Sequence, residues 1–469
     1  MTTRRIDGRF LGEAVVGLGA VLAGGAVLVG VLVVAAGPLL EFDHLVARGV
    51  NAAIATRPRV VATLGVLTAP GSTVVGAAVL TTLALALLAR RQRGLALFVV
   101  VTGLGALALG TALKELVGRL RPVVDVPVAT APGPSFPSGH TLTATVWVGA
   151  VLLVLLPPVP ERARRAVLGV GVALVVVVGL TRIALGVHYV SDVVAGWLIG
   201  LGWLAVTAHA FQAWRRRADL PVAPLHEGLA PESADELRPA PDHAGRPAHP
   251  WRTAAQLVAA AVLLLGVVIG LGRVVTVFAV GADLDCALWF TTHRVPELAG
   301  PSEVAAEIGG TGTVIAVGTA ACVLVLAVLR HWRPVVAIAV ALVGEVLIFL
   351  TGSAVVDRPR PAVSHLDSEL PPTSSFPSGH VAASICTYGS IAAVVFCATR
   401  RWWRWAAVGT AVALVLTVAL ARLYRGAHFP TDVLGSVLFA VPWLIVTLRV
   451  VGVRPAPRRR FASAPHADP

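Results

Sequence analysis

The hexapeptide Ser-Phe-Pro-Ser-Gly-His occupies residues 135–140 and recurs unchanged at residues 375–380, an offset of 240 residues. A second set keeps the same offset, because Arg182, His188 and Asp192 recur as Arg422, His428 and Asp432. A repeat of this length means that one structural unit is built twice along the chain. Three apolar stretches precede the hexapeptide in each half, so we expect the two copies to run parallel, not inverted.

The composition is typical of a membrane protein. Hydrophobic residues make up 56% of the 469 residues and charged residues only 13%, with a mean hydropathy of +0.82. Soluble domains usually carry about 25% charged residues. The net charge of +13 could indicate nucleic acid binding, but the arginine clusters stand between apolar runs, as they do at the cytoplasmic ends of membrane helices. We therefore expect membrane lipids, and no nucleic acid, as partners.

Twelve stretches are apolar enough to cross a membrane as helices, which takes about 20 residues each. They lie at residues 12–40, 72–89, 95–117, 141–156, 166–185, 192–214, 253–279, 313–329, 332–352, 381–399, 405–421 and 432–450. The sequence thus predicts an all-α membrane protein of two tandem, parallel six-helix bundles. The expected domains are residues 1–214 and 251–452, joined by a Pro-rich cytoplasmic linker at 215–250 that we expect to be disordered, with a basic cytoplasmic tail at 453–469.

Arginine clusters alternate with the apolar stretches and predict an orientation. They lie at residues 4–9, 90–93, 162–165, 215–217, 330–333, 400–404 and 458–460. All of them fall on one side of the membrane if both termini and the linker are cytoplasmic. The loops that carry the repeated motifs then face outward, which predicts a multi-pass protein of the cell membrane with its sites on the outer face.

The repeated residues carry the groups that phosphoryl transfer needs. A phosphate dianion needs cations and several hydrogen-bond donors around its oxygens. In the first copy the candidate cations are Lys114, Arg121 and Arg182, and Ser138 offers a hydroxyl. The backbone at Gly139 opens a predicted helix, whose N-terminus attracts anions and can approach a ligand closely where glycine stands. These residues together predict a phosphate cradle.

Two histidines and one aspartate are the candidate reacting groups. His188 stands four residues before Asp192, a spacing that suits a nucleophile held and polarised by a carboxylate. His140, beside the predicted cradle, suits the general acid that protonates a leaving alkoxide. A single Arg or His at a helix end is more often an anchor or a cap. Three clusters that converge on one side in both copies favour a catalytic site, because ionisable groups at span ends are costly.

These residues resemble the type 2 phosphatidic acid phosphatase family, which shares its core with bacterial acid phosphatases and vanadium haloperoxidases. The family's Lys-x6-Arg-Pro motif is matched from Lys114 to Pro122, its Pro-Ser-Gly-His motif at residues 137–140, and its Ser-Arg-x5-His-x3-Asp motif at residues 181–192, where Thr181 replaces Ser. The resemblance implies a six-helix core in each copy and hydrolysis without a metal or other cofactor. It also implies a phosphohistidine on His188, an acid role for His140, and phosphate binding by Lys114, Arg121, Ser138, Gly139 and Arg182.

The second copy departs from the first in its phosphate-binding set. It keeps the candidate catalytic residues His380, His428 and Asp432 and the candidate phosphate ligands Arg360, Ser378, Gly379 and Arg422. Seven residues before Arg360 stands Ser353, whereas the first copy has Lys114, the only lysine of the chain. A charged hydrogen bond is worth about 1.5–3 kcal/mol, so its loss slows chemistry about tenfold to a hundredfold. We expect a weaker or retuned second site; the alternative is a regulatory or acceptor-binding copy.

The favoured function is hydrolysis of a lipid phosphate monoester or diphosphate, whose tail stays in the membrane while its headgroup reaches the loops. Candidate substrates are undecaprenyl diphosphate, phosphatidic acid and phosphatidylglycerol phosphate. One alternative is a phosphotransferase that passes the phosphoryl group to a sugar or a lipid alcohol. Another is a non-catalytic binder or transporter of lipid phosphates, against which the intact His140, His188 and Asp192 argue. A haloperoxidase is disfavoured, because those relatives are soluble.

Overall fold

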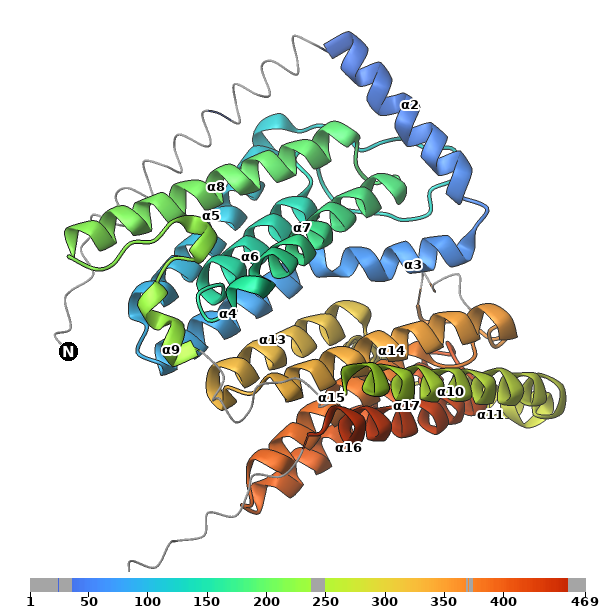
Figure 1. Ribbon diagram of the computed structural model, residues 1–469. Helices are drawn as coiled ribbons and strands as arrows, with labels where there is room; N and C mark the ends of the chain where they lie inside the picture. The colour runs from blue at the N-terminus through green and yellow to red at the C-terminus, as the bar shows by residue number, and fades with distance from the viewer. Residues whose placement is uncertain (1–23, 25–35, 238–248, 368–369, 371–373, 454–469) are drawn as a thin grey trace, which may run out of the picture.

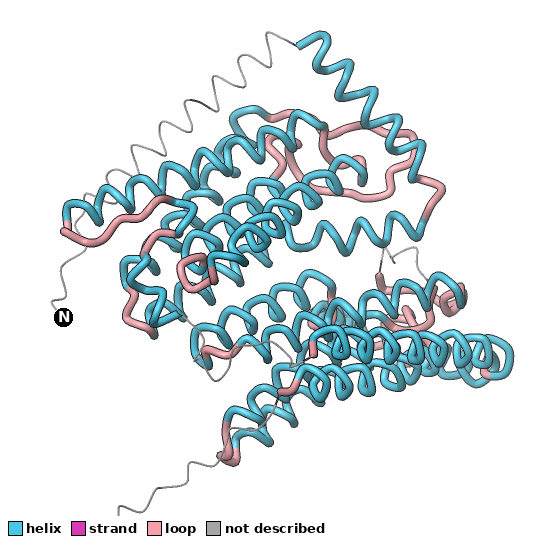
Figure 2. The backbone as a smooth tube through the Cα atoms, viewed as in Figure 1, coloured by secondary structure: helices cyan, strands magenta, loops and turns pink. Residues whose placement is uncertain are grey.

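The computed structural model describes residues 36–237, 249–367 and 374–453, together with residues 24 and 370. This part of the chain consists of helices and loops and contains no strand (Figure 2). The helices form two bundles, one from each half of the sequence, that lie side by side (Figure 1). The all-α membrane fold predicted from the repeat is thereby confirmed.

The first bundle carries the first set of motifs. Its helices are α2 (Ala36–Ile54), α3 (Pro58–Thr68), α4 (Thr73–Ala89), α5 (Arg93–Val117), α6 (Gly139–Leu155), α7 (Glu161–Ala184) and α8 (Val190–Arg217). A short 3-10 turn joins α3 to α4, and the two helices form one apolar stretch of 32 residues. The predicted first span, at residues 12–40, lies largely outside the described residues.

The second bundle repeats this order. Its helices are α10 (Pro250–Phe278), α11 (Val280–Thr292), α12 (Ala299–Glu307), α13 (Thr311–Leu329), α14 (Trp332–Val356), α15 (Gly379–Ala398), α16 (Trp403–Tyr424) and α17 (Pro430–Val451). By the offset of the repeat, α11 corresponds to α2, the pair α12 and α13 corresponds to α3 and α4, and α14 corresponds to α5. Each motif therefore lies at an equivalent helix end in both bundles.

The described helices account for nearly all of the predicted spans. Nine are long and apolar enough to cross a membrane, and α12 with α13, bent by 46° at their junction, gives a tenth. Helix α6 is apolar but shorter, with 17 residues. Together these elements cover every predicted span except the one at residues 12–40.

The two bundles meet along α4 and α13, which are equivalent helices (Figure 1). Ala316 and Val323 of α13 belong to the buried apolar cluster that α4 helps to form. At the C-terminal ends of both helices, the Arg90 guanidinium donates to the carbonyl oxygen of Val328 at 3.3 Å. Because equivalent ends meet, the copies run in the same direction, and their motif-bearing ends lie on the same side.

Matching tryptophan–glycine contacts bring α5 and α8 together in the first bundle, and α14 and α17 in the second. Trp203 of α8 donates its indole N–H to the carbonyl oxygen of Thr102 in α5 at 2.8 Å. Its ring lies so close to Gly105 that a methyl group built there would come within 2.0 Å of it. Trp443 packs on Gly344 in the same way, again at 2.0 Å. Only glycine permits this approach, which helps to hold the first motif beside the third.

The expected disordered linker differs from what the structure contains. Helix α8 runs on to Arg217, and two 3-10 turns and the short helix α9 (Ala234–Leu237) follow. Leu229 is fully buried in the core of the first bundle. Arg215 donates to both carboxylate oxygens of Glu232 at 2.7 Å. One buried leucine and one ion pair thus anchor a segment whose Pro-rich composition indicated disorder; residues 238–248 lie outside the described residues.

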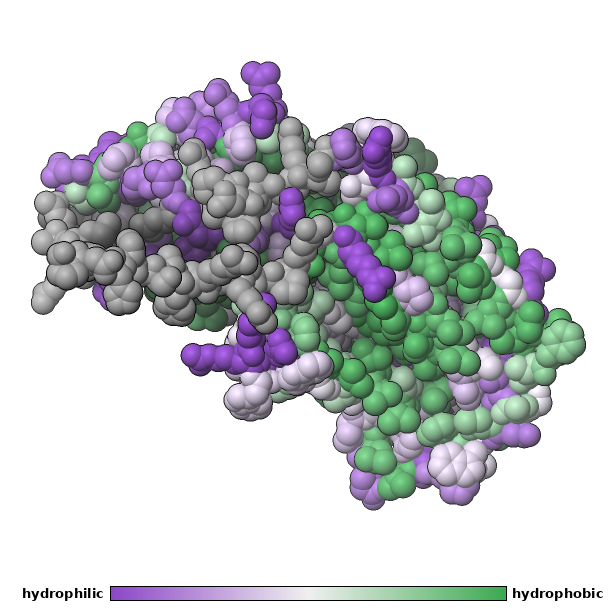
Figure 3. Space-filling model, turned by 60° about the horizontal axis from the view of Figure 1, so that its bottom comes forward, coloured by the Kyte–Doolittle hydropathy of each residue, from purple (hydrophilic) through white to green (hydrophobic). Residues whose placement is uncertain are grey.

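The outer surface of the bundles is apolar over wide areas. Figure 3 shows a broad area of hydrophobic side chains flanked by hydrophilic ones. On α10, Val258, Val262 and Leu263 are each more than 60% exposed. Soluble monomers rarely expose contiguous apolar surface of this extent, so the helices are covered by membrane and the protein is a multi-pass membrane protein.

Candidate active site

The three motifs of the first copy meet at one end of its bundle. Lys114 lies in the last turn of α5, α6 begins inside the second motif, and the third motif covers the turn between α7 and α8. The Ser138 backbone N–H donates to the carbonyl oxygen of Asp192 at 3.0 Å, and that of Ser135 donates to Arg119 at 2.8 Å. These two bonds fasten the second motif to the third and to the first.

The N-terminus of α6 forms a cradle for an anion. Ser138 caps the helix and Gly139 begins it, so the first backbone N–H groups and the positive end of the helix dipole are available. A methyl group built on Gly139 would lie 3.5 Å from Nζ of Lys114. Arg182 of α7 donates from Nη1 to the Thr68 hydroxyl at 3.1 Å, while its buried Nε has no partner among the described residues. The cradle therefore has two cations with donors to spare.

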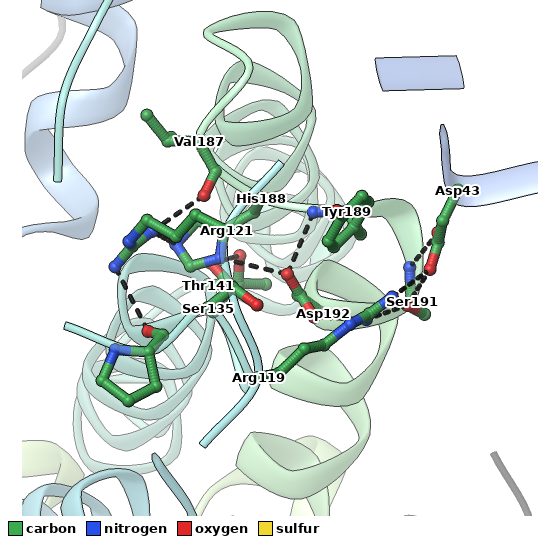
Figure 4. Close-up of polar contacts among 12 residues, drawn as sticks. Asp43, Arg119, Arg121, Ser135, Thr141, Val187, His188, Tyr189, Ser191 and Asp192 are labelled. Carbon is green, nitrogen blue, oxygen red and sulfur yellow. Dashed lines mark hydrogen bonds and ion pairs between the residues drawn. The ribbon is translucent and has the colours of Figure 1, made fainter. Parts of the chain in front are cut away.

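Arg121 is held in place by carbonyl oxygens of the loop that precedes α6. It donates to Gly133 from Nε and to Pro132 from Nη2, each at 2.9 Å. Its Nη1 donates to Val187 at 2.8 Å and lies 3.2 Å from Nε2 of His188 (Figure 4). The guanidinium thus stands beside one ring nitrogen of the histidine predicted to be the nucleophile.

His188 and Asp192 form a buried pair. Nδ1 of His188 lies 3.5 Å from Oδ2 of Asp192, which also accepts the Tyr189 backbone N–H at 3.0 Å. The distance is too long for a hydrogen bond, and Nδ1 has no hydrogen-bond partner among the described residues. Oδ1 of Asp192 accepts from Arg119 at 2.7 Å. The carboxylate faces Nδ1, which leaves Nε2 directed toward Arg121 (Figure 4).

The charge state of His188 follows from its surroundings. Burial lowers the pKa of the His188 imidazole to about 4, since the nearby carboxylate of Asp192, which raises it, offsets the burial only in part. The positive charges of Arg121 and Arg182 lower it further. His188 is therefore neutral at neutral pH, with a lone pair on Nε2. His140, in the first turn of α6, lies near the positive charges of Arg182 and Lys114.

The second copy reproduces this arrangement. The Ser378 backbone N–H donates to the carbonyl oxygen of Asp432 at 3.2 Å, and Arg360 donates to that of Ala427 at 2.8 Å. Nδ1 of His428 lies 3.6 Å from Oδ2 of Asp432 and 2.7 Å from the Ser375 carbonyl oxygen. Burial lowers the pKa of His428 to about 4 as well. The distance from the candidate nucleophile to its carboxylate is thus similar in both copies, but Nδ1 of His428 is hydrogen-bonded to a backbone carbonyl, whereas Nδ1 of His188 has no hydrogen-bond partner among the described residues.

The face of α14 that turns toward the second site differs from the same face of α5. Residues four positions apart lie on one side of a helix. On this side α14 has Glu345, Phe349 and Ser353. The corresponding residues of α5 are Ala106, Gly110 and Lys114. A methyl group built on Gly379 would come within 2.8 Å of the Phe349 ring. An aromatic ring therefore covers the glycine that Lys114 covers in the first copy.

A carboxylate also enters the second site. Asp367, from the loop before α15, accepts from Arg422 at 3.0 Å and forms a second ion pair with Arg425. The corresponding cation of the first copy, Arg182, has a neutral hydroxyl as its partner. The second site thus lacks the lysine, and its Arg422 is paired with a carboxylate, whereas Arg182, in the described part of the chain, is not.

A cavity of about 460 Å³ opens between the two bundles, beside the second site. Val61 and Arg182 line it from the first copy, and Glu345, Arg422 and His428 line it from the second. Most of its lining is apolar, including residues of α3, α13 and α14. The second site therefore borders an apolar space that exists only because the copies pack together.

Sequence reasoning missed several residues of these sites. Asp43 of α2 contacts Arg119 at 2.8 Å, and Asp283 of α11 contacts Arg358 at 2.6 Å; both arginines stand two residues before the arginine of the first motif. Their offset of 240, equal to that of the hexapeptide, was the available signal. Asp367 gave no signal, because the loop that carries it differs in length between the copies. Among the described residues, no group of three or more His, Cys, Asp or Glu side chains is arranged to hold a metal ion.

Comparison with known proteins shows several relatives. The chain is 35% identical over 127 residues to an undecaprenyl-diphosphatase of Sulfolobus acidocaldarius and 34% identical over 95 residues to phosphatidylglycerophosphatase B of Bacillus subtilis. These matches cover 26% and 20% of this chain, and 57% and 46% of the relatives, so the chain spans about half of their length. A decaprenylphosphoryl-5-phosphoribose phosphatase of Mycobacterium tuberculosis is 36% identical over 157 residues, which are 32% of this chain and 80% of the relative.

A family model supplies the last comparison. The model of the PAP2 superfamily matches the chain twice, over residues 93–216 and 330–455. The two matches contain both sets of motifs and together cover more than half of the sequence. The repeated hexapeptide, the two equivalent bundles and the two equivalent sites therefore have one explanation: the chain belongs to the PAP2 superfamily and contains two copies of its unit.

Proposed function

We propose that this protein hydrolyses a phosphate monoester or diphosphate carried by a membrane lipid, through a phosphohistidine on His188. One observation supports this proposal above all. A neutral, buried imidazole, backed by Asp192, presents Nε2 3.2 Å from Arg121, beside a helix N-terminus that Lys114 and Arg182 flank. Cations and helix dipole hold the phosphate, and the imidazole lone pair attacks it.

The reaction has two steps. In the first, Nε2 of His188 attacks phosphorus, the bond from phosphorus to the lipid oxygen breaks, and protonated His140 gives its proton to that oxygen. The bound dianion favours the protonated form of His140 that this step needs. In the second, water attacks the phosphohistidine while His140 takes up the water's proton, which releases phosphate and regenerates His188. Asp192 stabilises the positive imidazole ring that exists between the steps.

A lipid substrate fits the surroundings of the site. The bundles expose apolar surface to the membrane, so a hydrocarbon tail stays in lipid while its headgroup enters at the helix ends. The three relatives are named as phosphatases of undecaprenyl diphosphate, phosphatidylglycerophosphate and a decaprenylphosphoryl-phosphoribose. Undecaprenyl diphosphate, phosphatidic acid and phosphatidylglycerol phosphate are therefore the first substrates to test. Phosphate that carries oxygen from labelled water would distinguish hydrolysis from phosphoryl transfer to an alcohol.

We infer that both sites face the outside of the cell membrane. The described arginine clusters, at residues 90–93, 162–165, 215–217, 330–333 and 400–404, stand at the helix ends opposite to the motifs. Membrane proteins place such clusters on the cytoplasmic side, which leaves the motif-bearing ends outside.

The first copy carries most of the activity in this proposal. The second site lacks the lysine, has Phe349 against Gly379, and has Asp367 on Arg422. Each change weakens the attraction for a phosphate dianion, while His380, His428 and Asp432 remain. The second copy is therefore a weak phosphatase site and not an equal partner.

Separate histidine variants test this function. Purified wild-type protein, His188→Ala and His428→Ala are compared for phosphate release from the three lipids, without added metal and with or without vanadate. We expect His188→Ala to lose about tenfold to a hundredfold in rate, because only the weaker second site remains, and His428→Ala to lose less than half. Vanadate, which mimics the transition state, should inhibit the wild type. Absence of phosphate release from every lipid phosphate, or indifference to vanadate, would refute the proposal, and equal losses would refute the asymmetry.

A further inference from the structure

A buried carboxylate outside the three motifs reaches the first site from α2. Asp43 has no exposed surface, and its Oδ2 accepts from Nη2 of Arg119 at 2.8 Å. Its Oδ1 accepts the backbone N–H of Ser191 at 3.1 Å, and the Ser191 hydroxyl donates to Oδ2 (Figure 4). Its carboxylate is thus directed at Arg119 and at the start of α8, where Asp192 stands.

Arg119 carries this contact to the catalytic pair. Its Nη2 binds Asp43, and its Nη1 binds Oδ1 of Asp192 at 2.7 Å. The guanidinium also lies over the ring of Tyr189, 4.2 Å from its centre. A continuous series of charged contacts therefore runs from Asp43 through Arg119 and Asp192 to His188.

The second copy contains the same network. Asp283 of α11 accepts from Arg358 at 2.6 Å, from the Thr431 backbone N–H at 3.2 Å, and from the Thr431 hydroxyl. Arg358 in turn binds Oδ1 of Asp432 at 2.6 Å. The network is retained although Lys114 has no counterpart in this copy and Ser191 is replaced by Thr431, so its role concerns the Asp–His pair and not phosphate binding.

The charges explain what Asp43 contributes. Without it, the positive charge of Arg119 would be neutralised by Asp192 alone, and the pair would present no net charge to His188. With it, two carboxylates share one guanidinium, and a negative charge remains to stabilise the imidazole ring as it becomes positive. The rigid ends of the network also fix the Asp192 carboxylate, since a buried charge loses its position when a partner is removed.

We propose that Asp43 is a positioning residue, which acts through Arg119 to orient Asp192 against His188 and to preserve the negative charge that nucleophilic attack by His188 requires. This inference rests on the proposed function of the first site. Asp43 does not contact the phosphate cradle, so its role concerns the chemical step and not substrate affinity. Asp283 has the same relation to His428 in the second copy.

The experiment compares Asp43→Asn, Asp43→Glu and the matched variant Asp283→Asn in the full-length protein. Asp43→Asn should lower kcat for a lipid phosphate about tenfold to a hundredfold, as for one lost charged hydrogen bond, with KM within about twofold. Asp43→Glu, which restores the charge, should recover part of kcat. Thermal unfolding of the two asparagine variants should shift equally, because their networks match, whereas Asp283→Asn should lose at most the small share of kcat that the second copy contributes.

Three results separate the possible failures. An unchanged kcat in Asp43→Asn, or a rise in KM alone, would overturn the positioning role. A fall in activity that matches only the unfolded fraction, with no recovery in Asp43→Glu, would overturn it too. A wild-type protein that hydrolyses no lipid phosphate would instead refute the proposed function, which the same assay reports independently.

Discussion

At the scale of single residues, the proposed reaction depends on the protonation state of one imidazole. His188 is buried, and its pKa of about 4 keeps it neutral at neutral pH. The charge of Asp192 raises this pKa, against the effect of burial, while the charge of Arg121 lowers it. The same groups therefore set how basic the nucleophile is and where its lone pair points.

The pH dependence of Asp192→Asn tests this balance. Protonation of His188 blocks attack, so kcat/KM should fall on the acid side as the pH approaches the His188 pKa. Asp192 raises that pKa, so its loss should lower the pKa and move the acid limb to lower pH. The rate should fall about tenfold to a hundredfold at neutral pH, because the ring also loses its orientation. The measurement is the pH profile of kcat/KM for both proteins with the same substrate, so that ionisation of the substrate affects both profiles equally. A shift of the acid limb to higher pH would contradict the account.

Residues differ in how far the sequence predicts their place. His188, Asp192 and the hexapeptide were predicted because their spacing reflects local geometry: four residues place a carboxylate beside an imidazole at a helix start. Asp43 acts across 149 positions of chain through a packing contact between α2 and α8, and no local pattern encodes such a contact. Only the repeat pairs it with Asp283.

At the scale of elements, one face of α14 distinguishes the second site from the first. Phe349 covers Gly379, and Ser353, which is buried, replaces the lysine. The sequence predicted the missing lysine, because counting seven residues back from Arg360 is enough to find its position. It did not predict the role of Phe349, since the ring's contact with Gly379 depends on how α14 packs against α15.

Conversion of the second site tests this difference. We expect Phe349→Gly, Ser353→Lys and Asp367→Ala together, in the His188→Ala background, to raise phosphate release at least about tenfold, because they restore one charged contact and remove an opposing carboxylate. Rates of phosphate release from a lipid phosphate provide the measurement. The matched control adds His428→Ala, which should abolish the gain. A folded variant without any gain would mean that other features keep the second site weak.

At the scale of the whole molecule, two equivalent bundles share one face along α4 and α13. The repeat and the apolar stretches predicted the number, direction and class of these bundles. They could not predict the apolar cavity beside the second site, because its walls come from both copies. The Pro-rich composition of residues 215–250 indicated disorder where Leu229 is buried, since one apolar contact outweighs the composition around it.

The central claim is that His188, and not His428, carries the phosphoryl group during turnover. The most direct test is rapid quenching of wild-type protein during hydrolysis of undecaprenyl diphosphate or the best lipid substrate, followed by mass spectrometry of histidine-containing peptides under alkaline conditions. The account predicts phosphohistidine at His188 and at most a small fraction of that amount at His428. Equal amounts at both positions, or turnover without any phosphohistidine, would contradict it.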